Sequence, residues 1–132
     1  MDRHCENAMK LAKFLARNKK VKKVNYPGLK DHQYHEIAGQ QFKGKFGGLL
    51  TFELEDKDEC FRVINGLKLI KNTANLGDIR SLIIHPASTI YSDISIKKQK
   101  KLGVNSGLLR VSVGIENIND IIGDFTKAFK NL

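Results

Sequence analysis

The stretch from Leu108 to Ile115 constrains the fold more than any other part of this sequence. It is rich in leucine, valine and isoleucine, but apolar and polar residues do not alternate regularly along it. Such a run is typical of a strand that is buried on both faces, and it predicts a central strand of a sheet. A central strand needs a partner on each edge and other elements over its faces, and the rest of the chain has to supply them.

Three segments carry apolar residues at helical spacing, and we predict that they cover this sheet. They are residues 8–15, 60–67 and 118–129. Asp56 with Glu59 resembles a capping box before the second helix, and Asn117 is a candidate cap for the third. Two shorter helices are expected over residues 31–40 and 97–102, the latter ended by Gly103.

Three further segments have the composition of strands, namely residues 21–26, 49–54 and 81–86. We expect Gly44, Gly47 and Gly48 to allow close approach of the backbone at the entrance of the second one. They do not read as a phosphate-binding loop, because a strand and not a helix follows them. Strands and helices are mixed without regular βαβ repetition. The sequence therefore predicts one α+β domain over residues 1–132, with a mostly antiparallel sheet covered by helices.

The charge of the chain argues for a solvated surface and against binding of nucleic acid. The formal net charge is +9, but only five of the 23 basic residues are arginines, and no aromatic residue interrupts the two lysine clusters at 19–23 and 97–101. No apolar run is long enough to cross a bilayer, and the amino terminus does not resemble a signal peptide, so we expect a cytoplasmic protein without a membrane partner. Cys5 and Cys60 form no disulfide framework or metal motif.

The histidines are weak candidates for chemistry. His32 and His35 have a spacing that can bind metal, but no further ligands complete a site, and a surface position is the better interpretation. His85 lies at a strand end before a proline, where we expect a hydrogen-bonded structural histidine. His4 and Cys5 are neighbours on a helix and point apart, so they do not predict a nucleophile and its base.

Arg110 is the strongest candidate, because it lies inside the apolar strand at 108–115. A buried guanidinium requires an acidic partner, which can be an internal carboxylate or the carboxylate or phosphate of a ligand. Its planar fork suits a carboxylate bound through two hydrogen bonds. The residues alone leave a structural salt bridge and a ligand site both open.

Several blocks of this sequence, in their order and spacing, resemble the carboxy-terminal part of the Cys/Met-metabolism pyridoxal-phosphate (PLP) enzymes. The blocks are residues 1–8, 24–29, the pair His32 and His35, and residues 75–78, 81–89 and 107–116. The resemblance covers essentially the whole chain. It implies the small carboxy-terminal domain of the aspartate-aminotransferase-like fold, with the large cofactor-binding domain absent from residues 1–132.

The resemblance also implies roles for individual residues. In this family the arginine of the last strand block binds the α-carboxylate of the amino-acid substrate, which assigns that role to Arg110, and Asn75 lines the same pocket. The blocks at 75–78 and 81–89 look most like O-acetylhomoserine sulfhydrylase, which replaces the γ-substituent by sulfide or a thiol in methionine biosynthesis. Tyr91 departs from that branch, where histidine is common. Fragments of a methionine γ-lyase or of a cystathionine synthase or lyase are the alternatives.

One part of the family pattern is not found in this sequence. The Schiff-base lysine that holds PLP lies in a motif of the large domain, and no lysine here lies in such a motif. We therefore expect that this chain alone binds no PLP, has no catalytic residue and is inactive without a large domain. Enzymes of the family are usually homotetramers. A non-catalytic binding module remains the alternative of another class.

Overall fold

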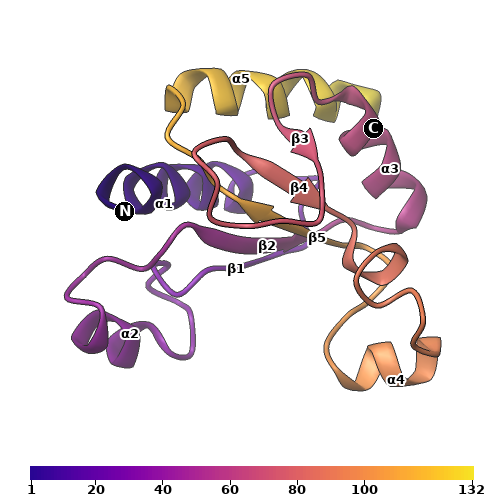
Figure 1. Cartoon of the computed structure of the whole chain (residues 1–132), viewed down its shortest axis with the longest axis horizontal. Helices are drawn as coiled ribbons and strands as arrows, with labels where there is room; N and C mark the ends of the chain where they lie inside the picture. Colours follow the sequence, from indigo (N-terminus) through magenta and orange to yellow (C-terminus); the bar gives the residue numbers. More distant parts are fainter.

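The computed structural model describes residues 1–132 as one five-stranded sheet with helices packed against it (Figure 1). The helices are α1 (Asp2–Ala16), α2 (His35–Gln41), α3 (Lys57–Gly66), α4 (Ile96–Lys101) and α5 (Ile118–Ala128), with short 3-10 turns η1 (Pro86–Ser88) and η2 (Phe129–Asn131). The strands are β1 (Lys23–Asn25), β2 (Leu49–Glu53), β3 (Lys71–Asn72), β4 (Leu82–Ile84) and β5 (Leu108–Ser112). No helix is long and apolar enough to span a membrane.

The sheet has the order β1-β2-β5-β4-β3, so β5 is the central strand, as the sequence predicts. The pairings β1–β2, β2–β5 and β4–β5 are antiparallel, whereas β3 pairs with β4 in parallel. The predicted α+β fold class is therefore confirmed. The sheet is mixed rather than uniformly antiparallel, because the unpredicted strand β3 adds a parallel edge.

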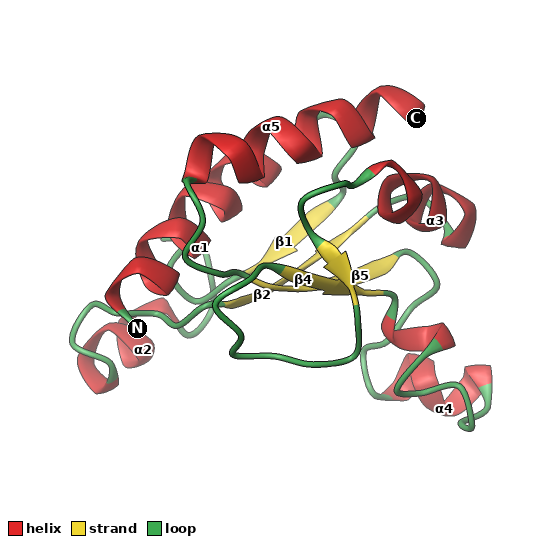
Figure 2. Cartoon of the chain, turned by 45° about the horizontal axis from the view of Figure 1, so that its top comes forward, coloured by secondary structure: helices red, strands yellow, loops and turns green.

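One face of the sheet forms the main core. Figure 2 shows α1, α3 and α5 together on this side, with α2 and α4 near opposite ends of the molecule. Phe52 of β2 is fully buried, and its ring lies edge-on to Phe125 of α5 with centroids 5.9 Å apart. Leu109 and Val111 of β5 point into the same core. The apolar stripes of the three helices face the sheet and contact these side chains.

The predicted caps are present. The Asp56 side chain accepts a hydrogen bond from the Glu59 amide at 2.9 Å, and the Asn117 side chain accepts one from the Asn119 amide at 2.9 Å. Glu59 bonds the amide of Glu55 and not that of Asp56, so the capping box is displaced by one residue. Helix α2 begins at His35, four residues later than expected, because residues 27–34 form turns.

The expectation for the glycines before β2 is only partly right. Gly48 is closely packed, since a Cβ there would lie 3.1 Å from His4 Cβ and 3.3 Å from the Val113 carbonyl. Gly44 and Gly47 have open space around them and φ angles of +77° and +81°, which an L side chain rarely adopts. They are needed for the turn of the backbone and not for close approach.

A buried carboxylate fixes the segment that leads into β3. Asp124 lies on α5 and is 7% exposed. It accepts hydrogen bonds from the amides of Lys68, Leu69 and Ile70, with N–O distances between 2.9 and 3.2 Å. Three successive amides that would otherwise lack a partner are satisfied in this way, and the path of the chain between α3 and β3 is defined.

Candidate functional site

Arg110 lies on the face of the sheet opposite to the helical core. Its neighbours Leu109 and Val111 point into that core, so the side chain of Arg110 points the other way. The strand register places it between Thr51 of β2 and Ile84 of β4. Arg110 is half-buried in this position. The sheet therefore presents a single guanidinium in the middle of its second face.

The guanidinium has no acidic partner within the chain. The four ion pairs of the structure involve other residues. Its hydrogen bond within the chain runs from Nη2 to the backbone carbonyl of Asn75, at 3.3 Å. The internal salt bridge that the sequence left open is therefore absent, and most of the N–H donors of Arg110 remain available to a ligand.

Asn75 and Arg110, the two site residues predicted from the sequence, are brought together in this contact. They are 35 positions apart along the chain. The contact uses the main chain of Asn75, whereas its side-chain oxygen accepts a hydrogen bond from the Leu76 amide at 2.8 Å. The side chain of Asn75 is exposed, and its NH₂ group is free to donate to a bound anion.

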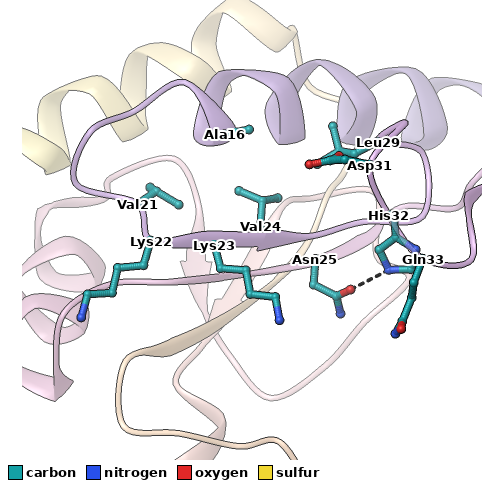
Figure 3. Close-up of a pocket in the computed structure, with 10 residues that line it drawn as sticks. All are labelled: Ala16, Val21, Lys22, Lys23, Val24, Asn25, Leu29, Asp31, His32 and Gln33. Atoms are coloured by element: carbon teal, nitrogen blue, oxygen red, sulfur yellow. Dashed lines mark hydrogen bonds between the residues drawn. The ribbon is translucent and has the colours of Figure 1, made fainter.

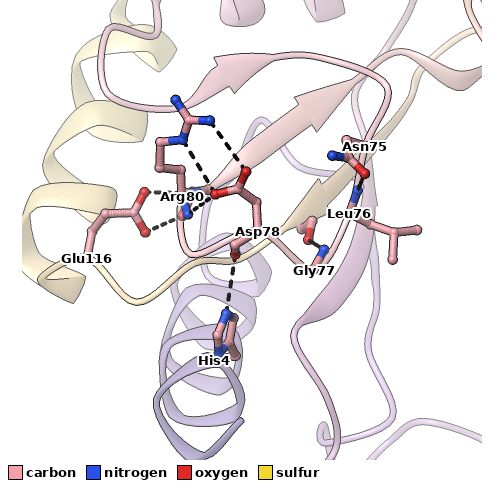
Figure 4. Close-up of polar contacts among 9 residues, drawn as sticks. His4, Asn75, Leu76, Gly77, Asp78, Arg80 and Glu116 are labelled. Carbon is pink, nitrogen blue, oxygen red and sulfur yellow. Dashed lines mark hydrogen bonds and ion pairs between the residues drawn. The ribbon is translucent and has the colours of Figure 1, made fainter.

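The loop of residues 73–80 carries the Asn75 carbonyl and is held at several points (Figure 4). The Gly77 amide donates to the Ser112 hydroxyl at 3.0 Å, and His4 Nε2–H of α1 donates to the Asp78 carbonyl at 3.3 Å. Within the loop, the backbone amide and the guanidinium of Arg80 both donate hydrogen bonds to the Asp78 carboxylate. These hydrogen bonds, the one from the Arg80 amide first, lower the pKa of Asp78 below its ordinary value.

Glu116 secures the far end of the same loop. Its carboxylate accepts hydrogen bonds from the Ser81 amide at 2.6 Å and from the Ser81 hydroxyl at 2.9 Å. The same hydroxyl accepts from the Gly114 amide, and buried Asn7 of α1 donates to the carbonyls of Gly114 and Glu116. The segment that follows β5 and the entrance of β4 are thus joined in one network of polar groups.

The sequence did not single out Ser112, Glu116 or Asn7 as members of this framework. A signal existed for Ser112, which is a hydroxyl residue between two valines of a strand whose other polar residue is Arg110. It is 5% exposed, so its hydroxyl has to find a partner inside the protein. No pattern along the chain identifies that partner as the amide of Gly77.

The histidines behave as structural residues. His85 is 2% exposed and both ring nitrogens are bonded, with Nε2–H donating to the Ser106 carbonyl at 2.8 Å and Nδ1 paired with the Ser88 hydroxyl at 2.8 Å. His35 bonds the Pro27 carbonyl through Nδ1. His85 therefore has the hydrogen-bonded structural role that the sequence predicts.

A hollow of about 470 Å³ lies beside the edge strand β1 (Figure 3). His32 lines it and bonds the Asn25 side chain at 2.8 Å. The aliphatic part of its wall comes from Val21, Val24 and Leu29. No three His, Cys, Asp or Glu side chains of the structure gather where they could hold a metal ion. Strand β2 separates β1 from β5, so this hollow lies at the edge of the sheet and not at Arg110.

The residues of this chain do not fit a covalent PLP site. A lysine that bonds the cofactor has to be held inside a pocket that positions and tunes the cofactor. The buried polar side chains are those of Asn7, Ser81, His85, Gln99, Ser112 and Asp124, and no lysine is among them. The pKa of Lys45 is raised by its exposed pairing with Asp2, opposite to the change that activates a lysine amine.

A match over almost the whole chain identifies its family. The family model described as "Cys/Met metabolism PLP-dependent enzyme" matches residues 1–130. The chain belongs to this family. The resemblance carried by the sequence blocks is thus confirmed, and with it the PLP dependence of the family.

Similar proteins come from several branches of the family. The chain is 44% identical to the O-acetyl-L-homoserine sulfhydrylase 1 of Thermus thermophilus, over 96% of this chain and 30% of that protein. It is 41% identical to an L-methionine gamma-lyase of Fusobacterium nucleatum, over 100% of this chain and 33% of that protein. The chain thus spans about a third of the length of the curated relatives it matches.

A solved structure has the same fold. It is a putative O-acetylhomoserine (thiol)-lyase from Campylobacter jejuni, with a TM-score of 0.88 and 40% sequence identity, matched over 97% of this chain and 31% of that one. That protein carries N'-pyridoxyl-lysine-5'-monophosphate at position 205. Its modified lysine lies outside the part matched by this chain.

Proposed function

We propose that this chain supplies the substrate α-carboxylate site of a PLP-dependent enzyme of the O-acetylhomoserine sulfhydrylase type. Arg110 binds the carboxylate through its planar fork, and the Asn75 side chain adds a neutral donor beside it. The chain alone catalyses nothing in this proposal, because it holds no lysine for the cofactor. It works together with a large cofactor-binding domain.

The observation that carries this proposal is the unpaired guanidinium in the middle of the second sheet face. An arginine that only stabilised the fold would be expected to contact an acidic side chain, and Arg110 has none. A carboxylate ligand would satisfy its free donors and would recover the cost of half-burying the charge. Sulfhydrylases among the similar proteins support this branch, whereas the γ-lyase at 41% identity keeps the lyase alternative open.

The chemistry at the γ-carbon belongs to the cofactor, which supplies the electron sink when it is bound. The residues of this chain bind and orient. Arg110 fixes the carboxylate end of the amino acid, so the rest of the substrate is directed away from the sheet face. Orientation of this kind lowers the entropic part of the barrier without any proton transfer by Arg110.

Nuclear magnetic resonance (NMR) titration of the ¹⁵N-labelled chain tests the carboxylate site directly. O-acetyl-L-homoserine and L-methionine are expected to bind with a dissociation constant of about 1 mM, which is typical of a site with few contacts. The shifts should concentrate at Arg110 Nε–H and the Asn75 side-chain amide. L-Methioninamide, which lacks the carboxylate, should produce none of them.

Substitution of Arg110 tests whether binding requires the planar guanidinium or only a positive charge. Arg110→Lys keeps the charge but loses two-point binding, and it should weaken the affinity about tenfold. Arg62→Lys on α3 is the matched control and should leave the affinity unchanged. Equal shifts with L-methioninamide, or equal affinity for the Arg110→Lys variant, would contradict the proposal. Binding of short oligonucleotides in place of amino acids would favour a non-catalytic binding module.

A chimera tests the function of the chain within an enzyme. This chain replaces the matching third of the Thermus thermophilus sulfhydrylase, to which it is 44% identical over 128 residues. We expect sulfhydrylase activity from the chimera and a fall in kcat/KM of at least about tenfold on Arg110→Lys. Unchanged kcat/KM would argue that the carboxylate is bound elsewhere.

A further inference from the structure

The contact between Arg110 and Asn75 orients the guanidinium only if the loop of residues 73–80 is itself fixed. The bond of 3.3 Å is long for a hydrogen bond from a charged donor, so it does not hold the loop in place. Residues 73–77 are all exposed. The Asn75 amide and side chain bond only Thr73 and Leu76, which belong to the same loop. The position of the carbonyl is therefore set by other residues.

Ser112 provides an anchor of the loop next to that carbonyl. Its hydroxyl accepts from the Gly77 amide at 3.0 Å, two residues beyond Asn75. Gly77 has a φ of +75°, which directs its amide to the sheet without the strain that a side chain would add. On the other side of Asn75, the Thr73 amide donates to the Ile83 carbonyl of β4 at 3.2 Å, which is a main-chain bond that no side chain controls. The anchors at His4 and Glu116 lie further from Asn75, at residues 78 and 81.

Ser112 also lies on the same strand and the same face as Arg110. Residues two apart in a strand point to one side of a sheet, so β5 carries both the guanidinium and the hydroxyl that holds its partner loop. Ser112 is 5% exposed and is paired on both sides, with Leu49 of β2 and Leu82 of β4, so the sheet fixes the position of its hydroxyl. One of the two sheet anchors nearest to the Asn75 carbonyl is therefore on the strand that carries Arg110.

We propose that Ser112 is a positioning residue of the carboxylate site, which holds Gly77 so that the Asn75 carbonyl orients the Arg110 guanidinium toward the substrate. This inference rests on the proposed function for its purpose, although the orientation itself can be measured without a ligand. Ser112 touches no substrate. Its effect reaches the site through the loop and is distinct from a contribution to stability.

The test compares Ser112→Ala, Ser112→Thr and a control variant in the full 132-residue chain. Alanine removes the hydroxyl, and threonine keeps it. Ser88→Ala is the control, because the Ser88 hydroxyl bonds His85 and no atom of the loop. Ser112→Ala should speed hydrogen exchange of the Gly77 amide about fivefold, as expected for the loss of one hydrogen bond. The NMR order parameter of Arg110 Nε–H should fall below about 0.6.

Ser112→Thr should restore the exchange rate of the Gly77 amide and the order parameter of Arg110 Nε–H, and Ser88→Ala should change neither quantity. The affinity for O-acetyl-L-homoserine should follow the order parameter, with a loss of about fivefold in Ser112→Ala. An unchanged order parameter in Ser112→Ala, or an equal fall in Ser88→Ala, would overturn the positioning role. If Ser112→Ala does not fold, the wild-type chain decides, because a Gly77 amide that exchanges as fast as in an unfolded peptide also overturns it.

The two proposals fail in different ways. A wild-type chain that binds no amino acid, but whose Arg110 loses order in Ser112→Ala, would overturn the carboxylate site and support the mechanical link. A wild-type chain that binds the amino acid, with an affinity and an Arg110 order that Ser112→Ala leaves unchanged, would overturn the link alone.

Discussion

Replacement of Asp124 should destabilise the protein more than that of any exposed carboxylate. Its carboxylate is 7% exposed and accepts from three successive amides, of which Ile70 N–H is buried and the other two are partly buried. Asp124→Ala leaves the Ile70 amide without a partner and lets water reach the others. The unsatisfied amide and the lost charge-assisted bonds together should cost about 3 kcal/mol of unfolding free energy.

Asp124→Asn keeps the shape of the side chain but removes its charge, so it shows how much of the stability depends on the charge. The amide oxygen can replace Oδ2 and accept from Leu69 and Ile70, but its NH₂ group then faces the Lys68 amide, where two donors oppose each other. We expect a loss of about 2 kcal/mol, smaller than for alanine. Asp120→Asn in the exposed first turn of α5 is the control, and it should cost less than about 1 kcal/mol through the helix dipole.

Urea unfolding followed by circular dichroism measures these differences, and thermal unfolding should show a midpoint lower by about 10 °C for Asp124→Ala. A loss below about 0.5 kcal/mol, which is the range of neutral surface substitutions, would refute the reasoning. The result also bears on the site. The amides held by Asp124 precede β3 directly, and β3 leads into the loop that carries Asn75.

Other substitutions test close packing and the buried thiol. Gly114→Ala should destabilise by at least about 2 kcal/mol in urea unfolding, because its Cβ would overlap the Ile79 carbonyl, whereas Gly123→Ala, with open space around it on α5, should be neutral or stabilising. Burial raises the pKa of the Cys60 thiol from 9.0 to about 12. The folded state thus keeps this proton longer than the unfolded chain, so its contribution to stability is complete below about pH 9 and is lost as the pH rises toward 12. In Cys60→Ala the urea midpoint should therefore decrease less steeply above pH 9 than in the wild type, and an equal slope would contradict a raised pKa of Cys60. In the native protein a disulfide reagent should titrate half-buried Cys5 quickly and Cys60 only on unfolding, and fast reaction of both thiols would show that Cys60 is accessible.

The sequence predicted the elements whose pattern is imposed by the core. The stripe of Ala8, Leu11, Ala12 and Leu15 identified α1, because all four are fully buried against the sheet. Strand β3 was missed, since its two residues are exposed and become a strand only by pairing with β4. The local sequence holds no signal for such tertiary pairing.

The site was only partly accessible to sequence reasoning. Arg110 stood out because a charge inside an apolar strand needs an explanation. The sequence also named Asn75, through the family resemblance, but it did not predict that the contact is made by the main chain. A backbone carbonyl is present at every position, so no residue type marks the one that is used. Asp124 was hidden for a related reason, because its partners are three amides without a motif.

The main-chain contact at residue 75 has a consequence for how this branch of enzymes can diversify. Arg110 is oriented by an oxygen that every amino acid possesses, so a substitution at position 75 need not disturb the arginine. The side chain at this position can therefore change while the backbone contact to Arg110 stays in place. In the function that we propose, the orientation of the carboxylate-binding arginine and the side-chain lining of its pocket are thus carried by different atoms of residue 75.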